Sequence, residues 1–135
     1  PVWTGSVWEC SQLVQFPQGS ALLMSVWFKR WGEYTAYLSG QYADNRLEIS
    51  GGSRLDWGNS FYAPQAFPDP QGRWVMFGWL TEKRPAPQAA GWSGCMSIPR
   101  VLSFEHGRLL QWPAKQLEAL RGKHWRMAAR ANRRY

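Results

Sequence analysis

Hydrophobic and polar positions alternate in short runs along most of the chain, and a period of two predicts β-strands. The runs cover residues 12–16, 21–28, 34–41, 46–50, 61–67, 73–80, 97–104 and 108–111. Turn-forming segments separate them, among them Pro17-Gln18-Gly19, Asp44-Asn45, Asp69-Pro70-Gln71-Gly72 and His106-Gly107. The pattern therefore predicts two successive groups of four antiparallel strands joined by short turns.

Each group of strands is about as long as one blade of a β-propeller, so we predict an all-β fold of about two to two and a half blades. A propeller ring closes with roughly four to eight blades, and a part of one would leave open sheet edges. We expect a homo-oligomer or a complementing chain to cover those edges. An eight-stranded β-sandwich is the rival architecture, because the strand spacing fits both.

The alternation ends at Pro113, and residues 114–121 are good helix formers. Leu117, Leu120, His124 and Met127 fall on one helical stripe. We therefore predict partial propeller blades over residues 1–112, followed by a terminal helix and basic tail over 113–135. Packing of this C-terminal helix on the last strands is the main expectation, and a helix on a membrane surface is the alternative.

The formal charge of the 135 residues is +7, but the basic side chains are unevenly placed. Residues 123–135 contain five of them and no acidic residue, whereas the body shows no basic stripe interleaved with aromatic residues. This distribution argues against nucleic-acid binding. No apolar run approaches the roughly 20 residues that span a bilayer, and the N-terminus does not resemble a signal peptide, so we expect no membrane partner and a cytoplasmic protein. Because the first residue is Pro1, we also expect a piece of a longer chain.

Cysteine and histidine are too sparse for a metal centre. Cys10 and Cys95 lie far apart in the sequence, and so do His106 and His124. We therefore predict no metal, no cofactor and two buried free thiols.

The segment Trp8-Glu9-Cys10 is the first candidate for chemistry. A lone glutamate in a strand is usually a solvated charge, but here the neighbours Trp3, Val7, Trp8 and Cys10 are apolar. A carboxyl buried among such groups has a raised pKa, which suits a general acid. The ten tryptophans of the chain offer flat surfaces for sugar rings, although core packing explains most of them.

Trp8-Glu9-Cys10 resembles the Glu-Cys motif of glycoside hydrolase family 32, which includes invertases, sucrose-6-phosphate hydrolases, inulinases and levanases. Four further segments resemble that family in the same order along residues 3–121. They are Asp56-Trp57-Gly58 with Phe61-Tyr62-Ala63, then Phe77-Gly78-Trp79, then Trp92 to Arg100 with its Met-Ser-Ile-Pro-Arg ending, and finally residues 107–121. Five segments in register make the resemblance specific.

The resemblance implies part of a five-bladed propeller with a funnel-shaped site, and hydrolysis of β-fructofuranosides such as sucrose with retention of configuration. Glu9 would protonate the glycosidic oxygen and then act as base toward water. Trp79 and Trp8 would contact the sugar, Asp56 and Tyr62 would orient its hydroxyls, and Cys10 would support Glu9. Each has a plainer reading: core packing for the tryptophans, Tyr62 and Cys10, and turn capping for Asp56.

The family's Asn-Asp-Pro-Asn-Gly segment, which carries the nucleophile, does not occur in the sequence, nor does its Arg-Asp-Pro motif. The one Asp-Pro pair, Asp69-Pro70, belongs to a predicted turn. A retaining mechanism needs two carboxyls, so we expect the chain alone to be inactive. One alternative is a non-catalytic carbohydrate-binding or assembly module derived from the propeller. Another is an unrelated tryptophan-rich β domain whose helix and basic tail bind a partner.

Overall fold

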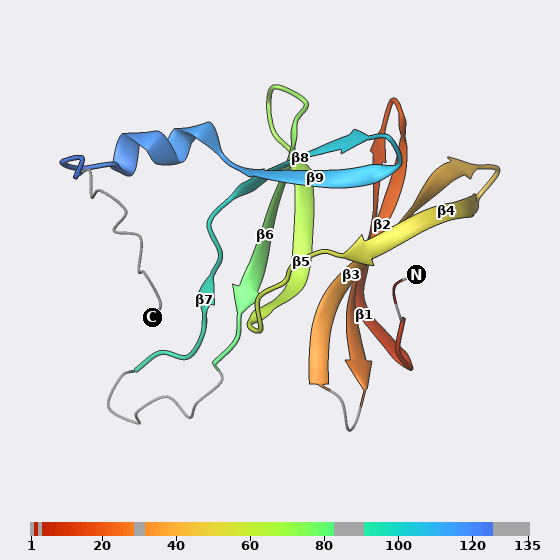
Figure 1. Cartoon of the computed structure of the whole chain (residues 1–135), viewed down its shortest axis with the longest axis horizontal. Helices are drawn as coiled ribbons and strands as arrows, with labels where there is room; N and C mark the ends of the chain where they lie inside the picture. Colours follow the sequence, from red (N-terminus) through yellow and green to blue (C-terminus); the bar gives the residue numbers. More distant parts are fainter. Residues whose placement is uncertain (1, 3, 29–31, 83–90, 126–135) are drawn as a thin grey trace, which may run out of the picture.

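Two antiparallel sheets form the computed structural model, which describes residues 2, 4–28, 32–82 and 91–125 (Figure 1). The first sheet contains β1 (Val7–Phe16), β2 (Gly19–Phe28), β3 (Gly32–Ala43) and β4 (Arg46–Arg54). The second contains β5 (Phe61–Pro68), β6 (Trp74–Leu80), β8 (Arg100–Glu105) and β9 (Arg108–Pro113), and the short β7 (Cys95–Met96) pairs with β6. Spatial order follows chain order in both sheets, so the predicted all-β meanders are confirmed.

Tight turns join the strands where the sequence provides residues that tolerate positive φ. Asp44 and Asn45, with φ of 50° and 60°, connect β3 to β4, and His106 and Gly107, with φ of 50° and 75°, connect β8 to β9. Two successive positive φ values match the right-handed twist of a hairpin. Both hairpins were predicted from these residue pairs.

The main hydrophobic core lies between the two sheets. Alternate residues of each strand point to one face, and most of those facing the other sheet are apolar. Phe16 of β1 and Phe104 of β8 stack with ring centroids 5.7 Å apart, which ties the two sheets together. The buried members of this core are Val14, Ala21, Leu23, Tyr37, Leu55, Phe61, Ala66, Met76, Leu102, Phe104 and Leu109.

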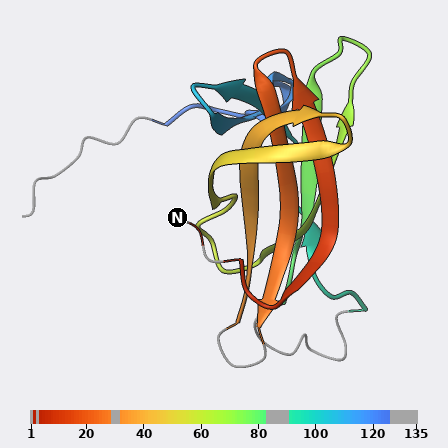
Figure 2. The same cartoon turned by 90° about the vertical axis from the view of Figure 1, so that its right-hand side faces the viewer.

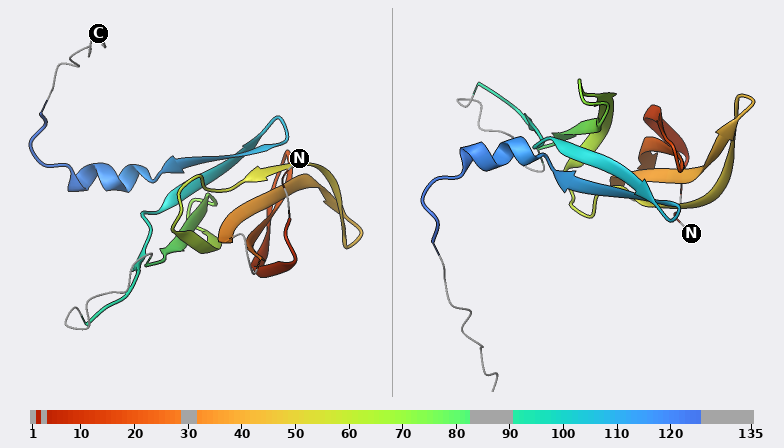
Figure 3. Two further views of the ribbon diagram at one scale, coloured as in Figure 1. Left: turned by 60° about the horizontal axis from the view of Figure 1, so that its bottom comes forward. Right: turned by 90° about the horizontal axis from the view of Figure 1, so that it is seen from above.

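The first strand of the second sheet, β5, packs against β1, β2 and β3 of the first sheet. Figures 1 and 2 show β5 running beside the first sheet, and Figure 3 shows the β8–β9 hairpin of the second sheet reaching toward the first, where β9 contacts β3. The indole Nε1 of Trp74 donates to the carbonyl oxygen of Gln15 over 2.9 Å. The sheets are thus joined by polar contacts as well as by the core, and these contacts concentrate along β1 and β5.

The C-terminal element differs from the expected helix. Residues Lys115–Leu120 form a 3₁₀-helix of six residues, none of them buried, which extends from the end of β9 away from both sheets (Figure 3). Leu120 is 81% exposed. The stripe that predicted packing on the last strands therefore does not pack there, and without that burial only a short helix forms. Met127 and the rest of the tail lie outside the described residues.

The two cysteines are free thiols, as predicted, but the expectation that they are buried is wrong. Cys10 lies in an irregular part of β1 with a φ of 50°, and Cys95 lies in the two-residue strand β7. Both side chains are exposed. Among the described residues, no helix is long and apolar enough to cross a membrane.

Candidate functional site

Matching β-bulges interrupt the first strand of each sheet. Between Glu9 and Gln12, β1 has one residue more than β2 opposite it, and between Tyr62 and Gln65, β5 has one residue more than β6. Each bulge contains a residue in the left-handed region, Cys10 at φ 50° and Ala63 at φ 47°. A bulge turns the side chain next to it in a new direction and is common beside active sites.

A short internal repeat underlies these bulges. Trp8-Glu9-Cys10-Ser11-Gln12 in β1 aligns with Phe61-Tyr62-Ala63-Pro64-Gln65 in β5, so that Glu9 corresponds to Tyr62 and Gln12 to Gln65. The residue types differ at most positions, but the place of the extra residue is the same. The correspondence follows from the strand registers, since only Gln12 and Gln65 are identical in type.

The structure brings Glu9 and Tyr62 together. The Tyr62 hydroxyl donates to Oε2 of Glu9 over 2.6 Å. Burial, followed by this hydrogen bond and the charge of Glu9, raises the pKa of Tyr62 well above its ordinary value of 10.0. Glu33 and Cys10 act on the pKa of Tyr62 in the same direction. Tyr62 therefore keeps its proton at neutral pH and remains a hydrogen-bond donor to the carboxylate.

Further contacts join β5 to the first sheet. The side-chain amide of Gln12 donates from Nε2 to the carbonyl oxygen of Ala66 over 2.6 Å, and its Oε1 accepts from the Ala66 amide over 2.7 Å. The Ser25 hydroxyl accepts from the amide of Ala63 over 2.9 Å. Ser25 is fully buried and lies opposite Glu9 on β2. Sequence analysis singled out neither Gln12 nor Ser25.

Trp79 lies next to Tyr62. It is the cross-strand partner of Tyr62, and 47% of its surface is exposed. The indole nitrogen lies over Gly94, where φ is +68° and a Cβ atom would overlap the ring. The turn before β7 thus supports one side of an indole that stands beside Tyr62. This is the arrangement expected of a flat wall for a sugar ring.

The surroundings of Glu9 differ from the expected apolar pocket. Glu9 and Cys10 are exposed, and so is Trp8, whose indole nitrogen donates to the carbonyl oxygen of Thr4 over 2.7 Å. Successive side chains of a strand point to opposite faces, so Trp8 cannot cover the carboxyl beside it. The main polar partner of Glu9 is the phenol from the other sheet. An exposed carboxyl with one fixed donor can exchange a proton with a ligand.

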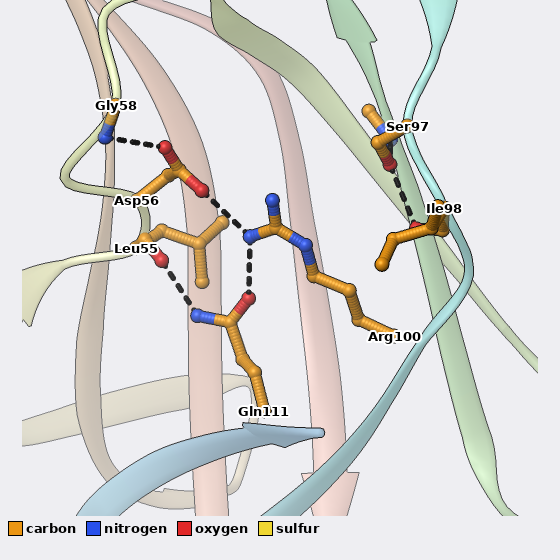
Figure 4. Close-up of polar contacts among 8 residues, drawn as sticks. Leu55, Asp56, Gly58, Ser97, Ile98, Arg100 and Gln111 are labelled. Atoms are coloured by element: carbon orange, nitrogen blue, oxygen red, sulfur yellow. Dashed lines mark hydrogen bonds and ion pairs between the residues drawn. The ribbon is translucent and has the colours of Figure 1, made fainter. Parts of the chain in front are cut away.

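Asp56 occupies a separate polar cluster (Figure 4). Its Oδ2 accepts from Nη1 of Arg100 and its Oδ1 accepts from the Gly58 amide, each over 2.7 Å. The same Arg100 nitrogen donates to Oε1 of Gln111 over 3.1 Å, and Gln111 donates to the carbonyl oxygen of Leu55 over 2.6 Å. The cluster ties the segment between β4 and β5 to β8 and β9. The turn-capping role considered for Asp56 is therefore present, and contact with a sugar remains a prediction.

Comparison with known proteins identifies relatives of one kind. The family model described as the N-terminal domain of glycosyl hydrolases family 32 matches residues 2–113. The sucrose-6-phosphate hydrolase of Staphylococcus xylosus is 43% identical over 91 residues, and that of Bacillus subtilis is 31% identical over 131 residues. These alignments cover 64% and 87% of this chain but only 18% and 27% of the two enzymes. The chain thus spans about a fifth to a quarter of the length of these relatives.

Solved structures show the same likeness. A family 32 glycoside hydrolase from Bifidobacterium adolescentis superposes with a TM-score of 0.71 and 27% identity over 83% of this chain and 19% of its own. Fructan 1-exohydrolase IIa from Cichorium intybus, solved in complex with 1-kestose, gives a TM-score of 0.62 and 26% identity over 86% of this chain and 26% of its own. These family 32 neighbours are β-propellers.

Proposed function

The chain belongs to the glycosyl hydrolases of family 32, and from this premise we propose that it forms part of a retaining β-fructofuranosidase and supplies the general acid/base, Glu9. Its two sheets are then two blades of the five-bladed propeller. The observation that carries the proposal is the 2.6 Å hydrogen bond by which Tyr62, the cross-strand partner of Trp79, orients the exposed carboxyl of Glu9.

The chemistry assigned to Glu9 has two stages. Its protonated carboxyl gives a proton to the glycosidic oxygen as the fructosyl bond breaks, and the resulting carboxylate then removes a proton from the incoming water. Tyr62 donates to one carboxyl oxygen, Oε2, and leaves the other available to the substrate. Because the phenol retains its proton, it stabilises the carboxylate that exists between the two proton transfers.

The first stage also needs a nucleophile. Retaining glycosidases place two carboxyls about 5–5.5 Å apart, and the family segment that carries the second one is absent from this sequence. We therefore expect hydrolysis only when the nucleophile-bearing part of a propeller, from a longer chain or a second one, lies opposite Glu9. The chain alone is expected to release neither glucose nor fructose from sucrose.

The remaining residues have supporting roles in the proposal. Trp79 provides a stacking surface for the sugar, and Cys10 borders the carboxyl from within the bulge of β1. Asp56 acts on Tyr62 indirectly, because its hydrogen bonds with Arg100 and Gly58 fix the segment that leads into β5. A carbohydrate ligand is supported by neighbours solved in complex with sucrose and with 1-kestose.

A chimeric enzyme tests the role of Glu9. The matching segment of the Staphylococcus xylosus sucrose-6-phosphate hydrolase is replaced by this chain, and hydrolysis of sucrose 6-phosphate is measured. Glu9→Gln should lower kcat by roughly 10²–10⁴-fold, the usual contribution of general acid–base catalysis. Fructosyl transfer from a leaving group that departs without protonation should suffer less. The control is Glu48→Gln, at an exposed glutamate of β4. Full activity of Glu9→Gln would contradict the assignment.

A second candidate function is carbohydrate binding without turnover, by a module that kept the scaffold but lost the catalytic aspartates. The exposure of Trp79 beside Tyr62 favours it. Titration of the purified chain with fructose, sucrose and 1-kestose, followed by tryptophan fluorescence, distinguishes the two candidates. Binding that weakens at least tenfold in Trp79→Ala, together with a chimera that stays inactive, would favour the binding module.

A further inference from the structure

We propose that Gln12 is a positioning residue, whose side-chain amide joins β1 to β5 and thereby holds Tyr62 against Glu9. Ser25 provides a second joint between the same two sheets. The positioning of Tyr62 is argued from the hydrogen bonds alone. Its effect on catalysis rests on the proposed function of Glu9.

The strands β1 and β5 belong to different sheets, so no ladder of main-chain hydrogen bonds connects them. The side-chain amide of Gln12 makes the two hydrogen bonds that one peptide group would make in such a ladder. It accepts from the Ala66 amide and donates to the Ala66 carbonyl, over 2.7 and 2.6 Å, as the peptide group of a neighbouring strand would. Few side chains can do this, because both a donor and an acceptor are needed at one end.

The contact between Gln12 and Ala66 and the contact between Glu9 and Tyr62 lie on opposite sides of the two bulges. Gln12 follows the bulge of β1, and Glu9 precedes it. Ala66 follows the bulge of β5, and Tyr62 precedes it. The two irregular segments are thus enclosed between the contact of Gln12 with Ala66 and the contact of Glu9 with Tyr62. Sliding or rotation of one strand against the other would break both contacts together.

Ser25 fixes the irregular segment itself. Ala63 has a left-handed φ of 47°, which removes its amide from the pairing with β6, and that amide donates to the Ser25 hydroxyl instead. Ser25 is fully buried and faces Glu9 across the β1–β2 pair. The first sheet therefore contacts β5 at three successive places around the bulge.

The bridge is not a local requirement of the bulge. Gln65 occupies the same place after the bulge of β5, but its Nε2 donates to the carbonyl oxygen of Pro64, over 2.8 Å within its own strand. A glutamine in this position can therefore form its side-chain hydrogen bond within its own strand. Gln12 instead reaches the other sheet, which identifies the contact with Ala66 as a joint between sheets.

The first experiment uses Gln12→Leu in the whole chain, which keeps the approximate size of the side chain and removes both hydrogen bonds. Hydrogen exchange of the Ala66 amide reports the joint, and the ¹³Cζ chemical shift of Tyr62, assigned with Tyr62→Phe, reports the hydrogen bond to Glu9. The shift in Glu9→Leu defines a phenol without its partner. Gln12→Leu should accelerate exchange at Ala66 at least tenfold and move the Tyr62 resonance at least half of the way to the Glu9→Leu value.

The matched control is Gln15→Leu, the same change at an exposed glutamine of the same strand, whose side chain forms no hydrogen bond with any other described residue. It should leave both signals unchanged. A merely structural role for Gln12 would lower thermal stability and accelerate exchange at Ala66, but would leave the Tyr62 resonance at its wild-type position. That result would overturn the proposal.

A second variant, Gln12→Glu, keeps the proposal testable if Gln12→Leu does not fold. It also tests directly whether position 12 needs both a donor and an acceptor. A protonated carboxyl has one donor and one acceptor, like an amide, whereas a carboxylate has acceptors alone. The variant should match the wild type below its carboxyl pKa, ordinarily about 4.3, and should lose the wild-type Tyr62 shift as pH rises above it. Spectra of the wild type at each pH correct for titration of Glu9 and Glu33. A Tyr62 shift that follows the wild type at every pH would also overturn the proposal.

Ser25→Ala tests the second joint. It should move the Tyr62 resonance in the same direction as Gln12→Leu and lower the protection of the Ala63 amide. If Gln12→Leu and Ser25→Ala both leave the Tyr62 shift unchanged, neither residue positions the pair. Because these signals are read in the chain by itself, they do not depend on whether the chimeric enzyme is active.

Discussion

The Tyr62 hydroxyl donates to Oε2 of Glu9 over 2.6 Å, although the two residues are 53 positions apart and lie in different sheets. The bond joins the residues that precede the two matching bulges. The carboxyl of Glu9 is therefore oriented by a group whose position depends on how the sheets pack. Disturbance of that packing should affect the carboxyl before it affects the strands themselves.

The first prediction concerns the ionisation of Tyr62. Glu9→Gln should lower the pKa of Tyr62, because it removes the negative charge that disfavours the phenolate. The pKa should stay above the ordinary value of 10.0, because burial is the largest cause of the shift and remains. A ¹³C NMR titration of tyrosine-labelled protein above pH 9 measures the change, with Glu48→Gln as control. Equal pKa values in Glu9→Gln and the wild type would be inconsistent with the contact.

The same shift predicts how stability depends on pH. A tyrosine whose pKa is raised in the folded protein contributes stability that is present below its unfolded pKa, near 10.0, and is lost as pH rises toward the folded value. The free energy of unfolding of the wild type should therefore fall between about pH 10 and 12 more steeply than that of Tyr62→Phe. Urea unfolding at successive pH values tests this. Parallel curves would show that Tyr62 titrates alike in both states.

Gly78→Ala should destabilise the second sheet. A Cβ atom at this position of β6 would overlap the buried ring of Phe61, whose other neighbours include the Arg100 guanidinium, 4.2 Å from its centroid. Overpacking of this kind costs about 1–3 kcal/mol. Gly122→Ala is the control, because the space around Gly122 is open. The two free energies of unfolding, measured with urea, should differ by that amount, and equal values would mean that the ring moves aside freely.

Asp56→Ala should loosen the segment between β4 and β5. The variant removes the acceptors for Arg100 and for the Gly58 amide and leaves a partly buried guanidinium with fewer partners. We expect a loss of about 1–3 kcal/mol in the free energy of unfolding. Amide exchange should rise at Gly58 and remain unchanged at Ala21 of β2, which is far along the chain. An unaltered exchange rate at Gly58 would exclude the proposed cap.

The turn between β5 and β6 predicts an acid-sensitive contribution. The hydrogen bond from Arg73 holds the pKa of Asp69 below its ordinary value of 3.8, with smaller help from the amides of Arg73 and Gln71. A lowered folded pKa gives stability that is present above the unfolded pKa and is lost as pH falls through the folded value. Asp69→Asn should therefore show less loss of stability than the wild type below about pH 3.8. Identical acid unfolding profiles would contradict this.

The strands could be predicted because their signals are local. Period-two alternation and pairs such as Asp44-Asn45 act within a few residues, and the structure follows both. The helix after Pro113 could not, because a helical stripe stabilises a helix only where it packs, and none of the residues Lys115–Leu120 is buried. Local propensity without a packing surface gave a short 3₁₀ turn.

The site was predicted in part, and for the same reason. The resemblance to family 32 identified Glu9 and Tyr62, but sequence neighbours misled us about the burial of Glu9, because Trp8 points to the opposite face. The bridge from Gln12 depends on the relative placement of two sheets, which no pattern within one strand contains.

The bridge from Gln12 has an evolutionary consequence. It reaches only the main-chain amide and carbonyl of Ala66, and those two groups are common to every residue except proline. Mutations along β5 can therefore accumulate without loss of the joint, provided that the replacement at position 66 fits the core. A second sheet of different ancestry could be exchanged beside a strand that carries this glutamine, and the geometry of the carboxyl three residues before it would be inherited wherever the new sheet keeps a tyrosine at the place of Tyr62.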